Sequence, residues 1–476
     1  MVRRLCPAWV VCLALAASLS AAEATNPAPS PPIEWSWEWR PTQPETAPQV
    51  EVCPLKFDKK WAYAVEIDDG PSSTYTVALP LLAEFSFTDA PPGASGGRKQ
   101  PFVGGAAVIV LRVDGGNDTF LSWDQLRDLE KRGWRTVNHS YWHKGNHWDP
   151  KAALVEADVR RELFWSQAIL AEGLEPNGAP THFVYPNGYV IYEPFLAAYG
   201  LRSSSRVGGT SKRRFSGEGV KWTDLDRNYL DEGVWSKAND PLVGLRADPQ
   251  PGDFVIDFTH GVEGDPNSPN HRRWRERLRY LFTKFGQAGD DSLWCAPPSE
   301  IVEYAQAAKA AQVSVKSGRV SVSLPADFAG VSLTLRLSGV DAASITAPVG
   351  GRIHSQNDRV WLTTPALGTP DANAPTPRVE RIYEGPVKDL KFEKPIRLAG
   401  VRLRQNGGLS GEKKVKIAAR SLDGAESVLV DEATPDNWGA WLLYPTIPDR
   451  PAPLVSEVKI SPDKALQRCE IWAIKE

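Results

Sequence analysis

Five side chains that can bind a metal ion or move a proton lie in short motifs that each follow a short apolar segment of this sequence. Carboxylates and imidazoles are common protein ligands of transition metals, and they are also the usual general acids and bases. Placed together, such groups activate water and protonate a leaving group, which is the chemistry of a metal-dependent hydrolase. The five residues are Asp68, Asp69, His139, His143 and His260.

The adjacent carboxylates of Asp68 and Asp69 suit two different roles. Neighbouring residues of a strand point to opposite faces, so both serve one site only if the strand ends before them. Gly70 and Pro71 supply that break. One carboxylate can then bind a cation while the other acts as a base. An Asp-Gly turn that leads into a helix cap is the alternative explanation.

His139 and His143 are four residues apart, which puts both imidazoles on one side of a helix or tight turn. With one aspartate they form a two-nitrogen, one-oxygen ligand set that suits zinc first, with cobalt, nickel or iron as alternatives. Zinc lowers the pKa of a bound water to about 7. His147 continues the spacing, but Gly145 and Asn146 should break any helix, so we interpret it as a bystander or a substrate contact. Surface or packed histidines are the alternative for the pair.

The remaining histidines divide by position. His260 follows the apolar segment 253–258 and is placed to protonate a leaving group. His182 precedes its apolar segment, so we expect it at the opposite face of the fold in a structural role. His271 and His354 are expected at the surface.

These residues need a scaffold that brings distant segments together. Short apolar segments alternate with amphipathic helical segments, which predicts an α/β fold with a parallel sheet or barrel. In such a barrel the carboxyl ends of the strands converge on one face, where active sites lie. The expected strands are 61–67, 106–113, 134–138, 181–186 and 253–258, and the expected helices are 123–133, 153–173, 271–289 and 298–312.

The rest of the chain divides by composition. Arg3 and Arg4 precede a short apolar stretch with small residues after it, which is typical of a signal peptide, so we expect a secreted or periplasmic protein without a transmembrane segment. Strict alternation after residue 312 predicts β modules. The expected divisions are 1–24 signal peptide, 25–54 N-terminal arm or linker, 55–312 catalytic domain, 313–363 small β module, 364–378 linker and 379–476 β-sandwich.

Composition limits the class of protein. The chain has 476 residues with a formal net charge of -3 and no long basic run, which argues against a nucleic-acid partner. Cys53, Cys295 and Cys469 remain after the signal segment, and three thiols allow one disulfide. We expect Cys53 to pair with Cys295 and Cys469 to be buried. The oligomeric state has no sequence signal.

The motifs AVEIDDG, HSYWH and THG, in this order, resemble those of the NodB-type polysaccharide deacetylases, carbohydrate esterase family 4. The resemblance covers about residues 55–312 and implies a distorted (β/α) barrel. It implies that Asp68 is the catalytic base and His260 the general acid. The metal ligands that it implies are Asp69, His139 and His143, and Ser140 would brace their loop.

The third motif departs from the family pattern. The segment 183–189 (FVYPNGY) resembles a shorter variant, which implies that the backbone N–H of Asn187 binds the oxyanion. Phe258 would line the acetyl pocket, and Tyr185 and Trp142 are further candidates for substrate contact. Many members carry an arginine here that pairs with an acid tuning the base, and we find no replacement for that arginine in this sequence.

The function expected is removal of acetyl groups from a polysaccharide or glycan, from either nitrogen or oxygen. A non-sugar amide or ester hydrolase with the same metal site is one alternative. A glycan-binding protein with a degenerate hydrolase domain is another, because the segment 395–407 weakly resembles galactose-binding sandwiches, which either bind glycans or only pack against a neighbour. A stoichiometric transition metal would argue against the binding-only alternative.

Overall fold

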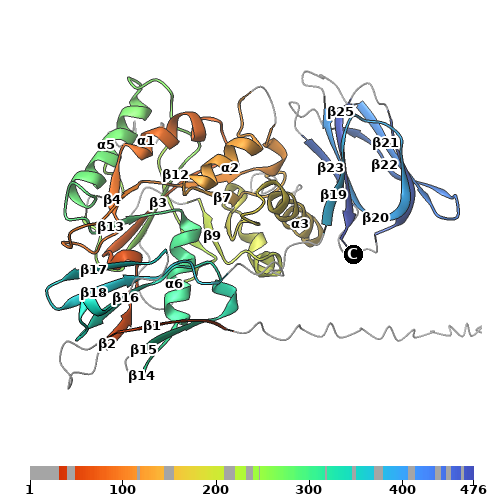
Figure 1. The fold of residues 1–476 in the computed structure, drawn as a ribbon. Helices are drawn as coiled ribbons and strands as arrows, with labels where there is room; N and C mark the ends of the chain where they lie inside the picture. Colours follow the sequence, from red (N-terminus) through yellow and green to blue (C-terminus); the bar gives the residue numbers. More distant parts are fainter. Residues whose placement is uncertain are drawn as a thin grey trace, which may run out of the picture. The chain divides into compact units, whose positions relative to one another are not determined.

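A computed structural model of the chain is drawn in Figure 1. The predicted signal peptide of residues 1–24 lies outside the described part, and so does His147. Within the described part no helix combines the length and apolarity needed to cross a bilayer. The structure describes residues 32–39, 49–114, 118–143, 155–207, 220–231, 240–245, 247–316, 319–345, 350–368, 379–405, 413–434, 441–445, 452–461 and 466–475.

A parallel sheet of nine strands carries the candidate site. Its central strand β3 (Trp61–Ile67) is buried along its whole length, as expected for a strand covered on both faces. The strands follow the order β10-β9-β8-β7-β6-β3-β12-β11, and β13 also pairs with β3. Strands and helices therefore form the α/β architecture that the alternating pattern predicts. The other strands are β6 (Gly105–Val108), β7 (Arg135–Asn138), β8 (His182–Val184), β9 (Ser203–Arg206), β10 (Leu225–Asp226), β11 (Asn228–Tyr229), β12 (Phe254–Thr259) and β13 (Leu293–Cys295).

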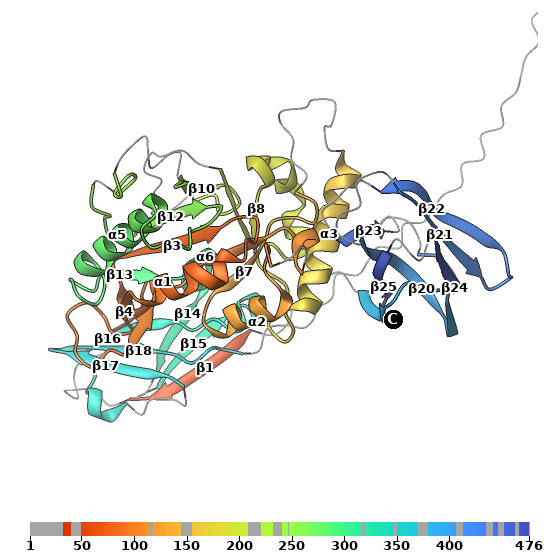
Figure 2. The same ribbon diagram turned by 90° about the horizontal axis from the view of Figure 1, so that it is seen from above.

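The helices lie close to where their periodicity predicts them. Ser122 and Gln125 form a reciprocal capping box at the start of α2, and the Ser268 side chain caps α5. In the view of Figure 2, α5 lies beside β12, and Arg277 of α5 binds the β12 carboxylate of Asp257. The helices are α1 (Leu79–Ala83), α2 (Trp123–Lys131), α3 (Glu156–Gly173), α5 (Pro269–Lys284) and α6 (Pro298–Ala310).

One expected strand is shorter than predicted. The segment 106–113 is a strand only as far as Val108, and Val110–Arg112 forms a 3-10 turn. The amide N–H of Val110 donates to the carbonyl of Ser140, and that of Leu111 donates to Tyr141. The chain therefore leaves the sheet to pair with the loop after β7.

The N-terminal arm of residues 25–54 contributes two strands to β modules instead of acting only as a linker. Strand β1 (Ile33–Glu38) pairs antiparallel with β15 (Arg319–Leu324), and β2 (Gln49–Val52) pairs with β16 (Thr334–Ser338). The IEWSWE segment of β1 alternates in burial, as a half-buried strand does. Strands β14 (Gln312–Lys316), β17 (Arg352–Gln356) and β18 (Arg359–Thr363) complete these two sheets.

The C-terminal region is all-β and has a hydrophobic core of its own, which includes Val401, Ile417 and Ile471. Every strand pair in it is antiparallel. The expected all-β module is therefore present, whereas its relation to galactose-binding sandwiches stays a prediction. Its strands are β19 (Val379–Gly385), β20 (Leu390–Gln405), β21 (Lys413–Ser421), β22 (Glu426–Thr434), β23 (Trp441–Pro445), β24 (Leu454–Ser461) and β25 (Leu466–Ile474).

Two sequence-based expectations about buried groups are wrong. Cys53, Cys295 and Cys469 are free and buried, so the expected bridge between the first two does not form. The Cys295 thiol instead faces the carbonyl of Val103. His271 and His354 are buried and not at the surface. His271 is drawn inward because it lies in the capped first turn of α5, where its Nδ1 contacts the Glu263 carbonyl.

Candidate metal centre and its polar network

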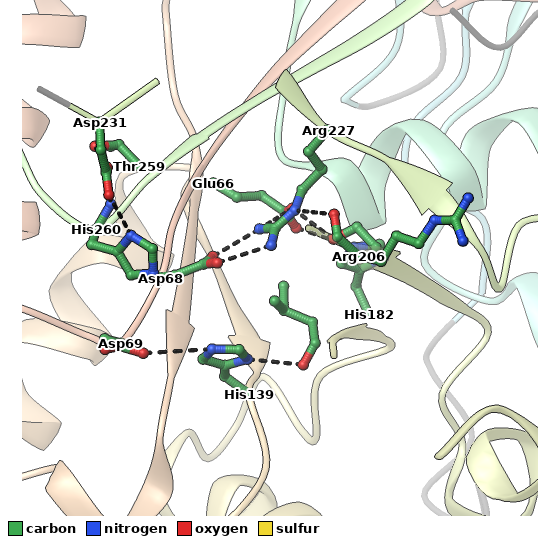
Figure 3. A network of polar contacts seen from close by, with 12 residues as sticks. Glu66, Asp68, Asp69, His139, His182, Arg206, Arg227, Asp231, Thr259 and His260 are labelled. Carbon is green, nitrogen blue, oxygen red and sulfur yellow. Dashed lines mark hydrogen bonds and ion pairs between the residues drawn. The ribbon is translucent and has the colours of Figure 1, made fainter. Parts of the chain in front are cut away.

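The fold brings Asp69, His139 and His143 together beyond the carboxyl ends of β3 and β7 (Figure 3 shows the first two). One ligand atom from each residue lies within 4.8 Å of the others. The Oδ1 atom of Asp69 is 3.5 Å from Nε2 of His139 and 3.7 Å from Nε2 of His143. Segments about 70 residues apart thus converge on one point, as strand ends of a parallel sheet do.

A tight turn, not a helix, sets the histidine spacing. Ser140 and His143 have φ angles of 66° and 58°, and the Ser140 hydroxyl accepts the His143 N–H at 2.9 Å. Buried Asn138 accepts the Ser140 N–H at 2.8 Å, and a Glu162 oxygen accepts the next two amide N–H groups. Left-handed backbone at non-glycine residues costs free energy and persists only where the surroundings impose it. The polar contacts of this turn impose it here.

The ligand atoms fit a divalent transition metal. The Nδ1 atom of His139 contacts the Val184 carbonyl at 2.8 Å, which makes it the protonated nitrogen and leaves Nε2 with a lone pair. Burial lowers the pKa of His143 to about 3, with His139 adding to the effect, so the ring is neutral at physiological pH. Asp69 Oδ1 is buried without a hydrogen-bond partner. A cation between these atoms would satisfy that oxygen.

The second oxygen of Asp69 has its own partner. Nη1 of Arg112, from the 3-10 turn after β6, donates to Asp69 Oδ2 at 3.0 Å. Burial alone raises the pKa of Asp69, but the contacts with His139, His143 and Arg112 prevail and hold that pKa well below its ordinary value. Asp69 therefore presents an ionised carboxylate with one oxygen anchored and the other aimed at the two imidazoles. Sequence reasoning missed Arg112.

Asp68 is held by a buried arginine. Nη1 and Nη2 of Arg227 donate to the two oxygens of Asp68 at 2.8 and 2.9 Å, as Figure 3 shows. The guanidinium carbon lies 3.8 Å from the centre of the Phe258 ring. Sequence reasoning found no arginine to stand beside Asp68, and the structure shows one. Arg227 comes from the link between β10 and β11, far in sequence from the third motif.

The same guanidinium reaches a second buried carboxylate. Nη1 of Arg227 donates to Glu66 of β3 at 3.0 Å, and Nε2 of His182 lies 3.1 Å from the other Glu66 oxygen. Burial raises the pKa of Glu66, but the charges of Arg227 and His182 outweigh it and lower the pKa to about 2. The prediction that His182 lies on the opposite face is wrong, because β8 places it beside Glu66 within the sheet.

His260 follows β12 and is paired with Asp231. Its Nδ1 lies 2.7 Å from Asp231 Oδ2, and its backbone N–H donates to Oδ1 at 2.9 Å. The hydrogen bond with Asp231 raises the pKa of His260. Burial alone would raise the pKa of Asp231, but His260 lowers it to about 2. With Nδ1 bound, His260 keeps Nε2 for a substrate, and Figure 3 shows its ring beside Asp68.

The predicted substrate contacts differ in exposure. Asn187 is exposed and has a φ of 52° in the turn Pro186–Gly188, which Tyr185 separates from Val184, whose carbonyl contacts His139. Trp142 is half-buried. Tyr185 is fully buried, with its hydroxyl donating to the Thr223 carbonyl, which argues against direct substrate contact by this side chain.

Phe258 is also fully buried. Its ring is stacked on Tyr229 at 4.9 Å between centroids and is covered by Arg227. This burial argues against direct substrate contact by Phe258 and leaves it as a support for the guanidinium. Half-buried Tyr229 is the outer member of the stack.

Comparison with known proteins gives a partial likeness to solved structures and none to families or curated proteins. No protein-family model matches the chain, and no curated protein matches it. Among solved structures, the chain is similar to the Streptococcus pyogenes deacetylase PplD in complex with acetate, with 19% identity and a TM-score of 0.26. The match covers 35% of this chain and 62% of that chain, which is less than two thirds of its length.

Proposed function

We propose that this chain is a metal-dependent hydrolase that removes acetyl groups from the nitrogen or oxygen of a polysaccharide or glycan. One observation carries the proposal. A buried oxygen of Asp69 has no hydrogen-bond partner and faces the Nε2 atoms of His139 and His143. Two further groups suited to proton transfer, Asp68 and His260, stand beside it. Such a set of ligands, base and acid serves hydrolysis of an amide or ester.

Asp69, His139 and His143 would hold the cation. Their two nitrogens and one oxygen suit zinc first, with cobalt, nickel or iron as alternatives. When bound, a cation of this class acts as a Lewis acid toward water and the substrate carbonyl. Arg112 keeps Asp69 ionised and oriented for this task through its contact with Oδ2.

Asp68 is the proposed base. Each carboxylate oxygen has two lone-pair directions, so the two hydrogen bonds from Arg227 leave capacity for a proton from an attacking water. The bidentate contact also fixes the plane of the carboxylate, so the group is already oriented for proton transfer before the substrate binds. Its burial keeps solvent from competing for that position.

His260 is the proposed acid. Asp231 binds Nδ1 and favours the protonated ring, so Nε2 carries a proton that can pass to a departing amine or alkoxide. The backbone N–H of Asn187, in the turn beside the Val184 carbonyl, is the proposed donor to the oxyanion. We extend the proposal to an exported protein that acts outside the cytoplasm.

The test is acetate release from chitin oligomers, peptidoglycan and acetylated xylan, each with and without a chelator. We expect release from at least one substrate, its loss with chelator, and its return with added zinc or cobalt. Asp69→Asn should release no acetate. Undiminished release by that variant, or in chelator, would contradict the proposal, and a purified chain without stoichiometric metal would favour a binding-only protein.

A further inference from the structure

A carboxylate lies within an otherwise apolar strand at the centre of the sheet. Glu66 is the only charged residue of β3 and is fully buried. Removing a carboxylate from water costs several kcal/mol unless it is paired and hydrogen-bonded. An apolar side chain would suit this strand better on packing grounds alone, so the contacts of Glu66 must explain its presence.

The two oxygens of Glu66 have neighbours on different sides. Oε2 accepts from Arg227 at 3.0 Å and from the Ser205 hydroxyl at 2.7 Å. Oε1 faces Nε2 of His182 at 3.1 Å, and Nδ1 of that ring lies 2.6 Å from the Ser203 hydroxyl. Oε1 itself has no hydrogen-bond partner, so His182 contacts it at ion-pair distance without an aligned hydrogen bond, and Nε2 also lies 3.3 Å from the Ser205 hydroxyl. Partners on β9 and β8 thus prevent rotation of the carboxylate.

The guanidinium of Arg227 is fixed by three acceptors. Its Nη1 is shared between Asp68 at 2.8 Å and Glu66 at 3.0 Å, and Nε donates to the Arg206 carbonyl at 3.0 Å. Phe258 covers one face of the group. Without Glu66, Nη1 would keep only Asp68 as an acceptor, and the planar guanidinium could turn about the Cδ–Nε bond. Such a turn would carry the Asp68 carboxylate with it.

We propose that Glu66 and His182 are positioning residues that act through Arg227 to hold the Asp68 carboxylate in its working orientation. The inference rests on the proposed function, because it gives Asp68 the role of base. His182 holds Glu66, Glu66 holds Nη1 of Arg227, and the fork of Arg227 holds both oxygens of Asp68. A displacement of about 1 Å at a reacting group can cost roughly 100-fold in rate.

The first test compares Glu66→Gln and His182→Asn with the parent chain. We expect kcat for acetate release to fall about 10- to 100-fold in Glu66→Gln and less in His182→Asn, with KM nearly unchanged. Zinc affinity measured by calorimetry should stay the same, because neither residue contacts the three ligands. The matched control is Asp257→Asn. Asp257 lies on β12, next to β3, and its ion pair with Arg277 of α5 is as deeply buried as that of Glu66 with Arg227. It should lower thermal stability while kcat stays within about threefold.

The second test is chemical rescue. Arg227→Ala with added guanidinium should recover part of its lost kcat, since the ion can occupy the place between the two carboxylates. Combining that change with Glu66→Gln should abolish the recovery, which a merely structural Glu66 would not do. If Arg227→Ala fails to fold, the comparison of Glu66→Gln with Asp257→Asn decides.

An unchanged kcat in Glu66→Gln, or an equal loss in Asp257→Asn, overturns the inference. Failure of the proposed function looks different, because the parent chain itself would then release no acetate and bind no metal. That result would remove the base that Glu66 is proposed to position, and so would overturn the inference as well.

Discussion

Arg227 and Asp68 meet through two parallel hydrogen bonds across 159 residues of sequence, and both side chains are buried. Forked contacts of this kind fix geometry as well as charge, because a planar guanidinium matches a carboxylate edge to edge. The relationship places a permanent cation beside the proposed base and leaves Asp69 free to serve a metal. The two adjacent aspartates therefore have different partners, which suits the separate roles proposed for them.

Replacing Arg227 by lysine should keep the charge and lose the fork. A single ammonium cannot span both Asp68 oxygens, so we expect kcat to fall about 100-fold with little change in KM. Steady-state acetate release measures this. Arg206→Lys is the matched control, because the Arg206 side chain pairs with Asp226 and only its backbone carbonyl contacts Arg227. Equal losses in the two variants would show that the fork has no special role.

The parallel sheet and the clustering of Asp69 with His139 and His143 were predictable from local signals. Strand β3 reads as one apolar run that ends at Ile67, so Asp68 and Asp69 had to follow a strand end. The spacing of His139 and His143 placed both rings on one side of any tight turn. These signals are local, because residue type and period depend only on near neighbours.

Arg227 and Asp231 could not be found in the same way. The strands beside them, β10 and β11, have two residues each, which is too short to show any periodicity. Glu66 did carry a signal, since a charge within the buried segment WAYAVEI requires a buried partner. The sequence does not say which of many arginines that partner is. Likewise β1 pairs with β15 almost 300 residues away, and local pattern specifies no partner strand.

The Asp231–His260 pair predicts the basic limb of the pH profile. Asp231 raises the pKa of His260, and an acid catalyst works only below its own pKa. Asp231→Asn should therefore lower that pKa and move the alkaline fall of kcat/KM to lower pH. The profile of kcat/KM against pH checks this, with Asp226→Asn as the control. A limb that stays in place would remove His260 from the role of acid.

The same pair affects stability in acid. The pKa of Asp231 is about 2 in the folded chain and about 4 when unfolded, so its contribution is present above about pH 4 and is lost as pH falls toward 2. The difference in the free energy of unfolding between the parent chain and Asp231→Asn should therefore shrink as pH falls through that window. Urea unfolding at several pH values measures the difference.

Zinc should stabilise the parent chain by mass action. A free concentration 100 times the dissociation constant adds about 2.7 kcal/mol, so the melting temperature should rise with added metal. Asp69→Asn and His143→Ala should show no such rise and no stoichiometric metal. His354→Gln, in a β module, is the control and should respond like the parent. Retained metal in both ligand variants would place the binding site elsewhere.

The three cysteines should be inert while the chain is folded. Burial raises the pKa of Cys295 to about 12 and that of Cys469 to about 11, and it also raises the pKa of Cys53, so almost no thiolate forms near pH 8. In a chain that lacks residues 1–24, no thiol should react with a thiol reagent while the chain is folded. After denaturation all three thiols should react. A disulfide-linked peptide of Cys53 with Cys295 would contradict the structure.

Glu162 should control metal affinity without touching the metal. Its Oε2 accepts the amide N–H groups of Tyr141 and Trp142, the two residues between Ser140 and His143. Glu162→Ala would leave these donors unsatisfied and loosen the turn, so we expect zinc affinity to fall about 10- to 100-fold. Competition with a chromogenic chelator measures it. Glu156→Ala, in the first turn of the same helix and exposed, is the control, since its ion-pair partner among the described residues is Arg160. If both variants bind zinc like the parent chain, the other contacts of the turn suffice to hold the ligands.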